Sequence, residues 1–258
     1  MFRGFKLSVV DDIFRAYKDA GKLQHQQNKR LVDGRLSQFR SQSGDLLSKT
    51  MTAEWFPEVD AQVFISHAHK DSELALGLSG HLFRHFGLTS FVDSAVWGYA
   101  DDLLKILDNE FCYNGESRTY NYQKRNRSTA HVHMMLSVAL SRMIDRCECI
   151  IFINTPQSIS SRKYIEGETT ESPWIYSEIA MTRLIEKRSP EAHRRIKTTA
   201  ATESYDAELK VRYDVDLDHL SELKQGTYKK WADQSNGVTG PAALTRLYDV
   251  VPASPRDR

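Results

Sequence analysis

The sequence has 258 residues, of which 40% are hydrophobic and 27% are charged, and its formal net charge is +1. This length suffices for one large domain with a sizeable core. A charge balance so close to neutral argues against general binding to nucleic acid or to a membrane surface. No apolar run suits a signal peptide or a membrane-spanning helix, and three cysteines are too few for a disulfide framework. We therefore expect a cytoplasmic protein.

The first 57 residues differ in character from the rest of the chain. Residues 1–57 are polar, and their scattered apolar residues follow only a thin helical pattern. We expect an N-terminal helical extension that either braces the main domain or mediates self-association. Pro57 favours a break, so residues 58–251 are expected to form the main domain. Residues 252–258 are expected to be a loose tail.

Strand and helix patterns alternate through most of the main domain. Predicted strands lie at 61–65, 90–92 and 149–153, and predicted helices at 71–86, 101–111, 128–144 and 173–188. The strand at 149–153 is apolar on both faces, which predicts a place in the middle of a parallel sheet. The alternation predicts an α/β, doubly wound, flavodoxin-like parallel sheet.

The remaining segments give weaker patterns. Polar residues 112–127 and 154–172 are predicted to be long loops or insertions, which in compact domains are usually functional or disordered. Ser128 is the expected cap of the helix that follows the first of them. Strands are also expected at 194–200 and 208–215, and helices at 217–233 and 242–248.

Polar and aromatic side chains occur in the loops after two predicted strands and at the start of the helix at 173–188. Because doubly wound sheets bind ligands beyond the carboxyl ends of their strands, we expect these segments to converge. Residues four apart share a helix face, which pairs Trp174 with Glu178. By spacing alone, a tryptophan is more often a core residue and a glutamate more often solvated. The candidate site residues are Glu178, Trp174, Ser66, His67, Asp93, Trp97 and Tyr99.

The first loop also allows a metal-site interpretation. His67, His69 and Asp71 form the pattern His-x-His-x-Asp, which opens a zinc-hydrolase motif. That motif places a histidine directly after the aspartate, where this sequence has Ser72, so a zinc-dependent hydrolase is a minor alternative. The sequence contains neither a glycine-rich phosphate loop nor a nucleophile elbow, which disfavours a conventional nucleotide fold.

Four segments, taken in order, resemble the Toll/interleukin-1 receptor (TIR) domain family. Residues 63–71 resemble its first strand and the loop that follows, residues 90–98 its second strand and mobile loop, and residues 149–156 its central strand. Ser-Pro-Trp-Ile-Tyr-Ser-Glu at 172–178 resembles the helix that carries the catalytic glutamate in NAD-cleaving members. The whole chain is similar to bacterial TIR proteins associated with defence against phage.

The resemblance implies an NAD+ glycohydrolase or ADP-ribosyl cyclase that uses NAD+ as its substrate and needs no cofactor or metal. Glu178 would be catalytic, Trp174 would stack on the substrate, and the loops at 66–71 and 93–99 would line the pocket. The reaction would deplete NAD+ or produce an ADP-ribose-derived signalling nucleotide for an effector protein in antiviral defence. Self-association through TIR domains is also implied.

The main alternative is a non-enzymatic TIR scaffold that signals by assembly. Many family members are such adaptors and lack the glutamate, whereas Glu178 is present here at the matching position. This favours an enzyme. The insertions at 112–127 and 154–172 depart from a minimal domain and leave the shape of the pocket and the identity of the product open.

Overall fold

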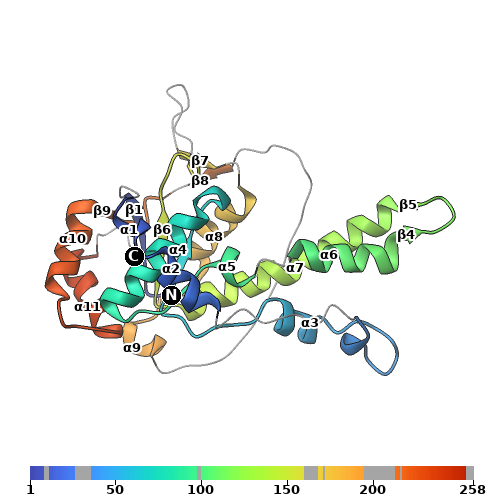
Figure 1. The fold of residues 1–258 in the computed structure, drawn as a ribbon, viewed down its shortest axis with the longest axis horizontal. Helices are drawn as coiled ribbons and strands as arrows, with labels where there is room; N and C mark the ends of the chain where they lie inside the picture. The colour runs from blue at the N-terminus through green and yellow to red at the C-terminus, as the bar shows by residue number, and fades with distance from the viewer. Residues whose placement is uncertain are drawn as a thin grey trace.

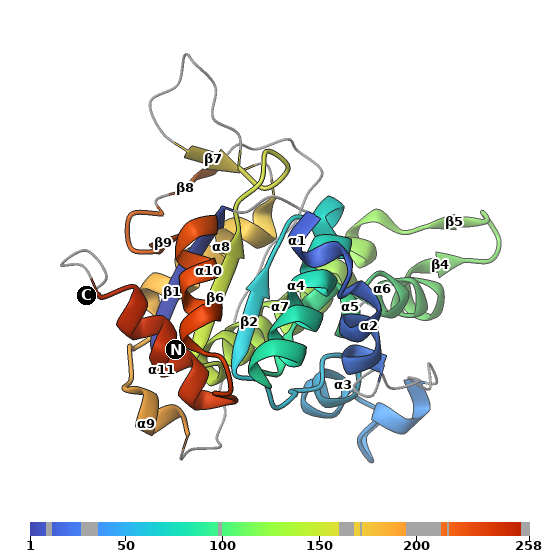
Figure 2. The same ribbon diagram turned by 60° about the vertical axis from the view of Figure 1, so that its left-hand side comes forward.

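A computed structural model describes residues 1–8, 12–26, 36–97, 100–159, 168–170, 172–194, 213–215 and 217–253. Its centre is a five-stranded parallel sheet with helices on both faces (Figures 1 and 2). The strands are β1 (Arg3–Ser8), β2 (Val63–Ser66), β3 (Ser90–Phe91), β6 (Cys149–Ile153) and β9 (Ser221–Lys224). Their spatial order is β3-β2-β6-β1-β9. The predicted α/β parallel sheet is thus confirmed.

The central position of β6 is confirmed as well. Ile151 of β6 pairs in register with Phe5 of β1 on one side and with Ile65 of β2 on the other. Alternate β6 side chains enter cores on opposite faces of the sheet: Ile151 packs with one cluster and Ile150 with another. A strand that is apolar at every position is needed because neither face meets water.

The order of the strands differs from a simple flavodoxin-like sheet in one respect. The run β3-β2-β6 matches the 2-1-3 part of that order. The next position is held by β1, from the amino terminus of the chain, and the edge by β9. Part of the predicted N-terminal helical extension is therefore wrong, because residues 3–8 are an interior strand of the sheet. The alternation of Phe5 and Leu7, both buried in one core, is the period-two signal for this strand.

The two helices after β1 pack within the same chain. These are α1 (Asp12–Arg15) and α2 (Lys18–Gln26), which lie against α4 (Ser72–Phe86). The contact is close because glycines line it: a Cβ on Gly80 would lie 2.0 Å from the backbone oxygen of Tyr17, and one on Gly21 would lie 1.9 Å from that of Leu76. This packing fits the predicted bracing of the main domain, and self-association through residues 1–57 stays a prediction. Residues 1–57 and 58–251 thus share one sheet and are not separate domains.

The helices of the two layers carry the expected apolar faces. One face of the sheet is covered by α4, α10 (Gln225–Gln234) and α11 (Pro241–Val250), the other by α3 (Ser48–Trp55), α7 (Tyr122–Arg146) and α8 (Pro173–Leu184). Gly87 ends α4 in the left-handed conformation, with φ 59°. The predicted helix at 217–233 is wrong in its first part, since residues 221–224 form β9 with alternating buried and exposed side chains.

The predicted loop at 112–127 is ordered and is part of an arm that extends to one side of the sheet (Figure 1). The helix α6 (Ala100–Leu107) continues into a π-helical turn, η3 (Asp108–Cys112), followed by the hairpin of β4 (Tyr113–Asn114) and β5 (Thr119–Tyr120). The next helix, α7, starts at Tyr122 and not at Ser128, because the Asn121 side chain accepts a hydrogen bond from the Lys124 N–H at 3.0 Å. The arm is thus built from regular structure.

Short elements complete the described chain. They are η1 (Leu36–Phe39), η2 (His69–Asp71), α5 (Asp93–Val96), α9 (Pro190–His193) and an antiparallel pair of β7 (Glu168–Thr170) with β8 (Tyr213–Val215). Much of the predicted loop at 154–172, the predicted strand at 194–200 and the end of the tail lie outside the described residues. None of the helices in the described part of the chain combines the length and apolar character needed to cross a bilayer.

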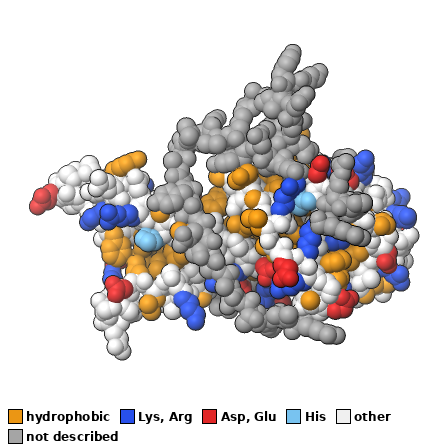
Figure 3. Space-filling model, turned by 180° about the vertical axis from the view of Figure 1, so that it is seen from behind, with side chains coloured by type: hydrophobic (Ala, Val, Ile, Leu, Met, Phe, Trp, Pro, Cys, Tyr) orange, Lys and Arg blue, Asp and Glu red, His pale blue; other side chains and the backbone are white. Residues whose placement is uncertain are grey.

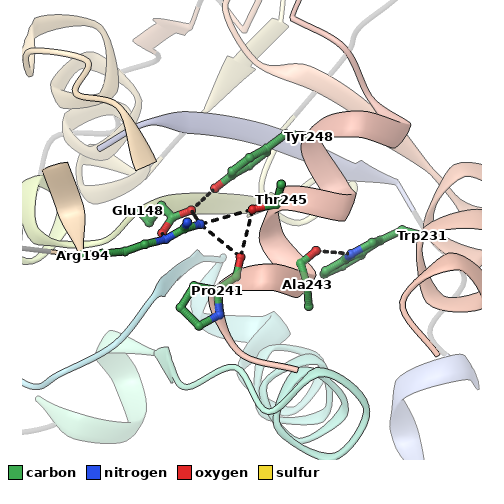
Figure 4. Close-up of polar contacts among 7 residues, drawn as sticks. All are labelled: Glu148, Arg194, Trp231, Pro241, Ala243, Thr245 and Tyr248. Atoms are coloured by element: carbon green, nitrogen blue, oxygen red, sulfur yellow. Dashed lines mark hydrogen bonds and ion pairs between the residues drawn. The ribbon is translucent and has the colours of Figure 1, made fainter. Parts of the chain in front are cut away.

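A buried ionic cluster lies at the amino-terminal end of the sheet, just before β6 (Figure 4). Glu148 is 3% exposed, and both of its carboxylate oxygens accept hydrogen bonds from Arg194, at 3.0 and 3.1 Å. The Tyr248 hydroxyl donates a third, at 3.1 Å. Burial raises the pKa of Glu148, and the Arg194 contacts partly offset that rise. This cluster joins α9 and α11 to the start of the central strand.

Candidate functional site

The position of Glu178 is set by the way α8 begins. The Ser172 hydroxyl accepts a hydrogen bond from the Ile175 N–H at 3.3 Å, and Pro173 occupies the first helical position, as predicted. The helix then buries Ile175 and Ile179 against Phe152 of β6. This packing turns Glu178 toward the sheet, where its side chain is 4% exposed.

Glu178 meets the carboxyl end of β2. Ser66 is the last residue of that strand, and its hydroxyl donates a hydrogen bond of 2.5 Å to Oε2 of Glu178. The pKa of Glu178 is raised well above its ordinary value of 4.5, mainly by burial and further by the charge of Asp93, whereas the Ser66 hydrogen bond lowers it. Burial and the charge of Asp93 therefore both favour the protonated form of Glu178, compared with an exposed glutamate.

Asp93 and His67 bring the second loop to the same place. Asp93 lies two residues after the end of β3 and is the first residue of α5. His67 is buried, with Nε2 2.8 Å from the Ser94 hydroxyl and Nδ1 3.5 Å from Oδ1 of Asp93. The second distance is too long for a hydrogen bond. The imidazole thus connects the loop after β2 to the start of α5.

The loop after the central strand joins this cluster through one further contact. Thr155 lies just beyond β6, and its hydroxyl donates a hydrogen bond of 2.5 Å to Oδ2 of Asp71. Segments that follow β2, β3 and β6 are therefore linked at the carboxyl ends of three parallel strands, with α8 above β2. Thr155 is not among the predicted site residues, and Ser94 is included only as part of the loop at 93–99. Each is a hydroxyl residue two positions after the end of a predicted strand.

The two aromatic candidates that the structure describes, Trp97 and Trp174, lie away from the Glu178 carboxyl. Trp97 is 5% exposed, its indole N–H donates to the Pro57 carbonyl at 3.1 Å, and its ring packs edge-on against Phe91 at 4.7 Å between centroids. It is a core residue and presents no free face to a substrate. Trp174 is half-buried and packs edge-on against His133 of α7 at 5.4 Å, on the side of the α7 core. Tyr99 lies outside the described residues.

The zinc-hydrolase alternative gains no support from the geometry. His67 is directed at Ser94 and Asp93, His69 is exposed, and Asp71 accepts from Thr155. Among the residues that the structure describes, no group of three His, Cys, Asp or Glu side chains is arranged to hold a metal ion. His67 and Asp71 therefore have other partners, and His69 is exposed to solvent at the surface.

The cavity at the Glu178 carboxyl is small. It measures about 10 Å³ and is lined by Ser66, Glu178, Thr182 and apolar side chains that include Phe152 and Leu220. Such a volume holds at most one water molecule. The described residues thus form a closed arrangement in which the carboxyl has no room for a nucleotide beside it.

Comparison with known proteins identifies no relative of this chain. No protein-family model matches it, and neither the curated proteins nor the solved structures give a significant match.

Proposed function

We propose that this chain is an NAD+-cleaving enzyme of the TIR type, with Glu178 as its catalytic carboxylate. The observation that carries the proposal is the convergence of Glu178, Ser66 and Asp93 at the carboxyl ends of β2 and β3. Open parallel α/β sheets bind their ligands at this edge. A deeply buried carboxyl with a strongly perturbed pKa at such an edge is typical of functional sites.

The proposed reaction needs one carboxylate. The bond between the ribose C1′ and the nicotinamide N1 breaks with its electron pair moving to N1, so neutral nicotinamide leaves and an oxocarbenium-like ribose remains. Water, or an internal nucleophile of the ADP-ribose, then adds to C1′ and releases a proton. Because the leaving group needs no protonation, ionised Glu178 stabilises the developing positive charge and no second acid is required.

The closed cavity and the raised pKa of Glu178 define what substrate binding must do. The side chain must leave its enclosed position, and it must lose its proton. The pyridinium ring of NAD+ is cationic, and an opposite charge nearby favours the ionised carboxyl, which opposes the effect of Asp93. At 4 Å such an attraction amounts to about 4 kcal/mol near a protein surface. Self-association of the chain is the proposed means of opening the site.

The proposal is tested by incubating the protein with NAD+ and with its 1,N6-etheno analogue over a range of protein concentrations. Chromatography measures nicotinamide release, and mass spectrometry identifies the ribose-containing product. Release is expected from the wild type and from Glu186→Gln, an exposed control after the same helix, and not from Glu178→Gln. Equal release by all three proteins, or none from the wild type at any concentration, would refute the proposal.

The closed cavity also favours a second candidate, a TIR-type scaffold without enzymatic activity. In that case Glu178 and Ser66 would form a structural contact between α8 and β2. This candidate predicts oligomers that survive Glu178→Gln and a wild type that releases no nicotinamide. Light scattering, performed on the same samples as the nicotinamide assay, distinguishes the two. A role in bacterial antiviral defence follows from either candidate through the family resemblance.

A further inference from the structure

A long groove lies between the arm and the segment that contains η1 and α3. Its volume is about 1080 Å³, and none of its described lining residues also lines the cavity at Glu178. One wall comes from α7, the other from α3 and residues 40–46, and one end from residues 107–112. In the view from behind, the arm shows apolar side chains flanked by Lys and Arg (Figure 3). The groove is thus separate from the proposed active site.

The floor of the groove is apolar and adaptable. Met51, Met134, Met135, Leu107 and Val138 line it. Methionine is unbranched and polarizable, so a surface of several methionines can repack around different apolar side chains. At the end of the groove Phe111 is 40% exposed and adds an aromatic surface to the lining. The floor is suited to a ligand with an apolar face.

The rim of the groove is positive on both walls. Lys49 stands on the α3 wall, Lys124 and Arg127 on the α7 wall, and all three are exposed. Within the described residues, none of these three side chains forms an ion pair with a carboxylate. The other two cationic lining residues, Arg40 and Arg142, pair with Glu110 and Glu58. Asp45 is the single carboxylate residue among the described lining residues, so the groove favours an anionic ligand.

The shape of the groove selects among anionic ligands. Lining positions 124, 127, 131, 134, 138 and 142 recur every three or four residues, and therefore form one stripe along α7. At 1.5 Å per residue this stripe is about 27 Å long, the length of a helix of about 18 residues. Helices on both walls suit a third helix between them. A nucleic acid would need phosphate contacts along the floor, where the lining is apolar.

We propose that this groove binds an acidic amphipathic helix of a partner protein. The apolar face of the helix would contact the methionine floor, and its acidic flanks would face Lys49 on one wall and Lys124 and Arg127 on the other. This is the helix-in-groove mode of recognition, with the anchors spaced at i, i+3 or i+4, and i+7. The proposal does not depend on NAD+ cleavage, since the two sites have no described lining residue in common.

The proposal is tested with a panel of fluorescein-labelled peptides of about 18 residues that carry leucine on one helical face and glutamate on its flanks. The leucine register varies between peptides, and each has a scrambled counterpart with the same composition. Fluorescence anisotropy with the full chain measures affinity. At least one peptide is expected to bind more tightly than its scrambled form. Lys124→Glu with Arg127→Glu should weaken that binding about tenfold or more, because two attractive charges become repulsive.

Two controls separate groove binding from general electrostatics and from misfolding. Lys229→Glu with Lys230→Glu makes the same change in charge on exposed positions of α10, and should leave peptide affinity unchanged. Met134→Glu places a charge in the apolar floor and should abolish peptide binding, while the circular dichroism spectrum stays the same as that of the wild type. The proposal is overturned if no peptide exceeds its scrambled form, or if both charge-reversal pairs weaken binding equally. It is also overturned if the groove variants instead lose binding to phosphatidylserine vesicles or lose self-association.

Discussion

Replacement of Glu178 by glutamine tests the proposed chemistry and the physical state of the site together. The substitution keeps the shape of the side chain and an oxygen that can accept the Ser66 hydrogen bond, but it removes the ionisable group. Loss of a group that stabilises charge in a transition state typically reduces the rate a hundred- to thousand-fold, or about 3–4 kcal/mol. Nicotinamide release by Glu178→Gln is expected to fall by that factor.

The same substitution should stabilise the protein at neutral pH. The pKa of Glu178 in the fold is raised above its ordinary value of 4.5, mainly by burial and then by Asp93. Above about pH 4.5 the unfolded chain has therefore lost a proton that the folded chain still holds, so wild-type stability falls as pH rises. Glutamine removes this dependence. The slope of the unfolding free energy against pH should differ between the two proteins by up to about 1.4 kcal/mol per pH unit.

Urea unfolding between pH 4 and 8, followed by circular dichroism, measures both slopes. At neutral pH each kcal/mol gained by the variant corresponds to about 2–4 °C in melting temperature for a chain of this size. Glu186→Gln, at an exposed position, serves as the matched control and should leave the slope unchanged. Parallel pH curves for wild type and Glu178→Gln would refute the argument that burial holds the proton on Glu178. Asp93→Asn removes one cause of the raised pKa of Glu178. The fall in unfolding free energy that depends on Glu178 should therefore end at a lower pH.

Three further predictions concern the scaffold. Gly80→Ala should lower the free energy of unfolding in urea by about 3 kcal/mol or more, because a Cβ there would lie 2.0 Å from the backbone oxygen of Tyr17. A decrease below about 0.5 kcal/mol would contradict the close helix contact. Arg194→Ala leaves the buried Glu148 carboxyl without its cation. It should lower the free energy of unfolding by about 2 kcal/mol, a figure that already allows for the partial exposure of Arg194 to solvent. Glu148→Gln should lower it by less. Burial lowers the pKa of His25 from 6.5 to about 4, so stability should decline as pH falls from 6.5 to 4, and His25→Gln should make that decline shallower.

Local patterns in the sequence predicted most of the framework correctly. The fully apolar run Cys149–Ile153 specified an interior strand, and the spacing of leucines through 71–86 followed by Gly87 specified a helix and its end. Ser172 with Pro173 specified the start of α8. These features depend on neighbouring residues alone, so they are visible without the fold. The convergence of the loops after β2 and β3 with α8 followed from the general rule for parallel sheets.

Other features were decided by contacts between distant parts of the chain. The alternation of Phe5 and Leu7 within residues 3–8 is too brief to specify an interior strand by itself. Pairing with β6 on one side and β9 on the other makes this segment one. Trp97 was a candidate site residue because it lies in the loop after a predicted strand, but Pro57, far away in sequence, supplies the acceptor that fixes its indole in the core. The groove along α7 likewise exists only because α3 packs opposite it.

The sequence by itself determined that Glu178 lies one helical turn into α8, near the carboxyl end of a parallel strand. Only the tertiary structure decided that its carboxyl is enclosed, bonded to Ser66 and close enough to Asp93 for its pKa to rise. The physical reason is that helix periodicity is a local property, whereas desolvation and the field of a second charge depend on which segments pack together. The state of Glu178 is therefore a property of the assembled site.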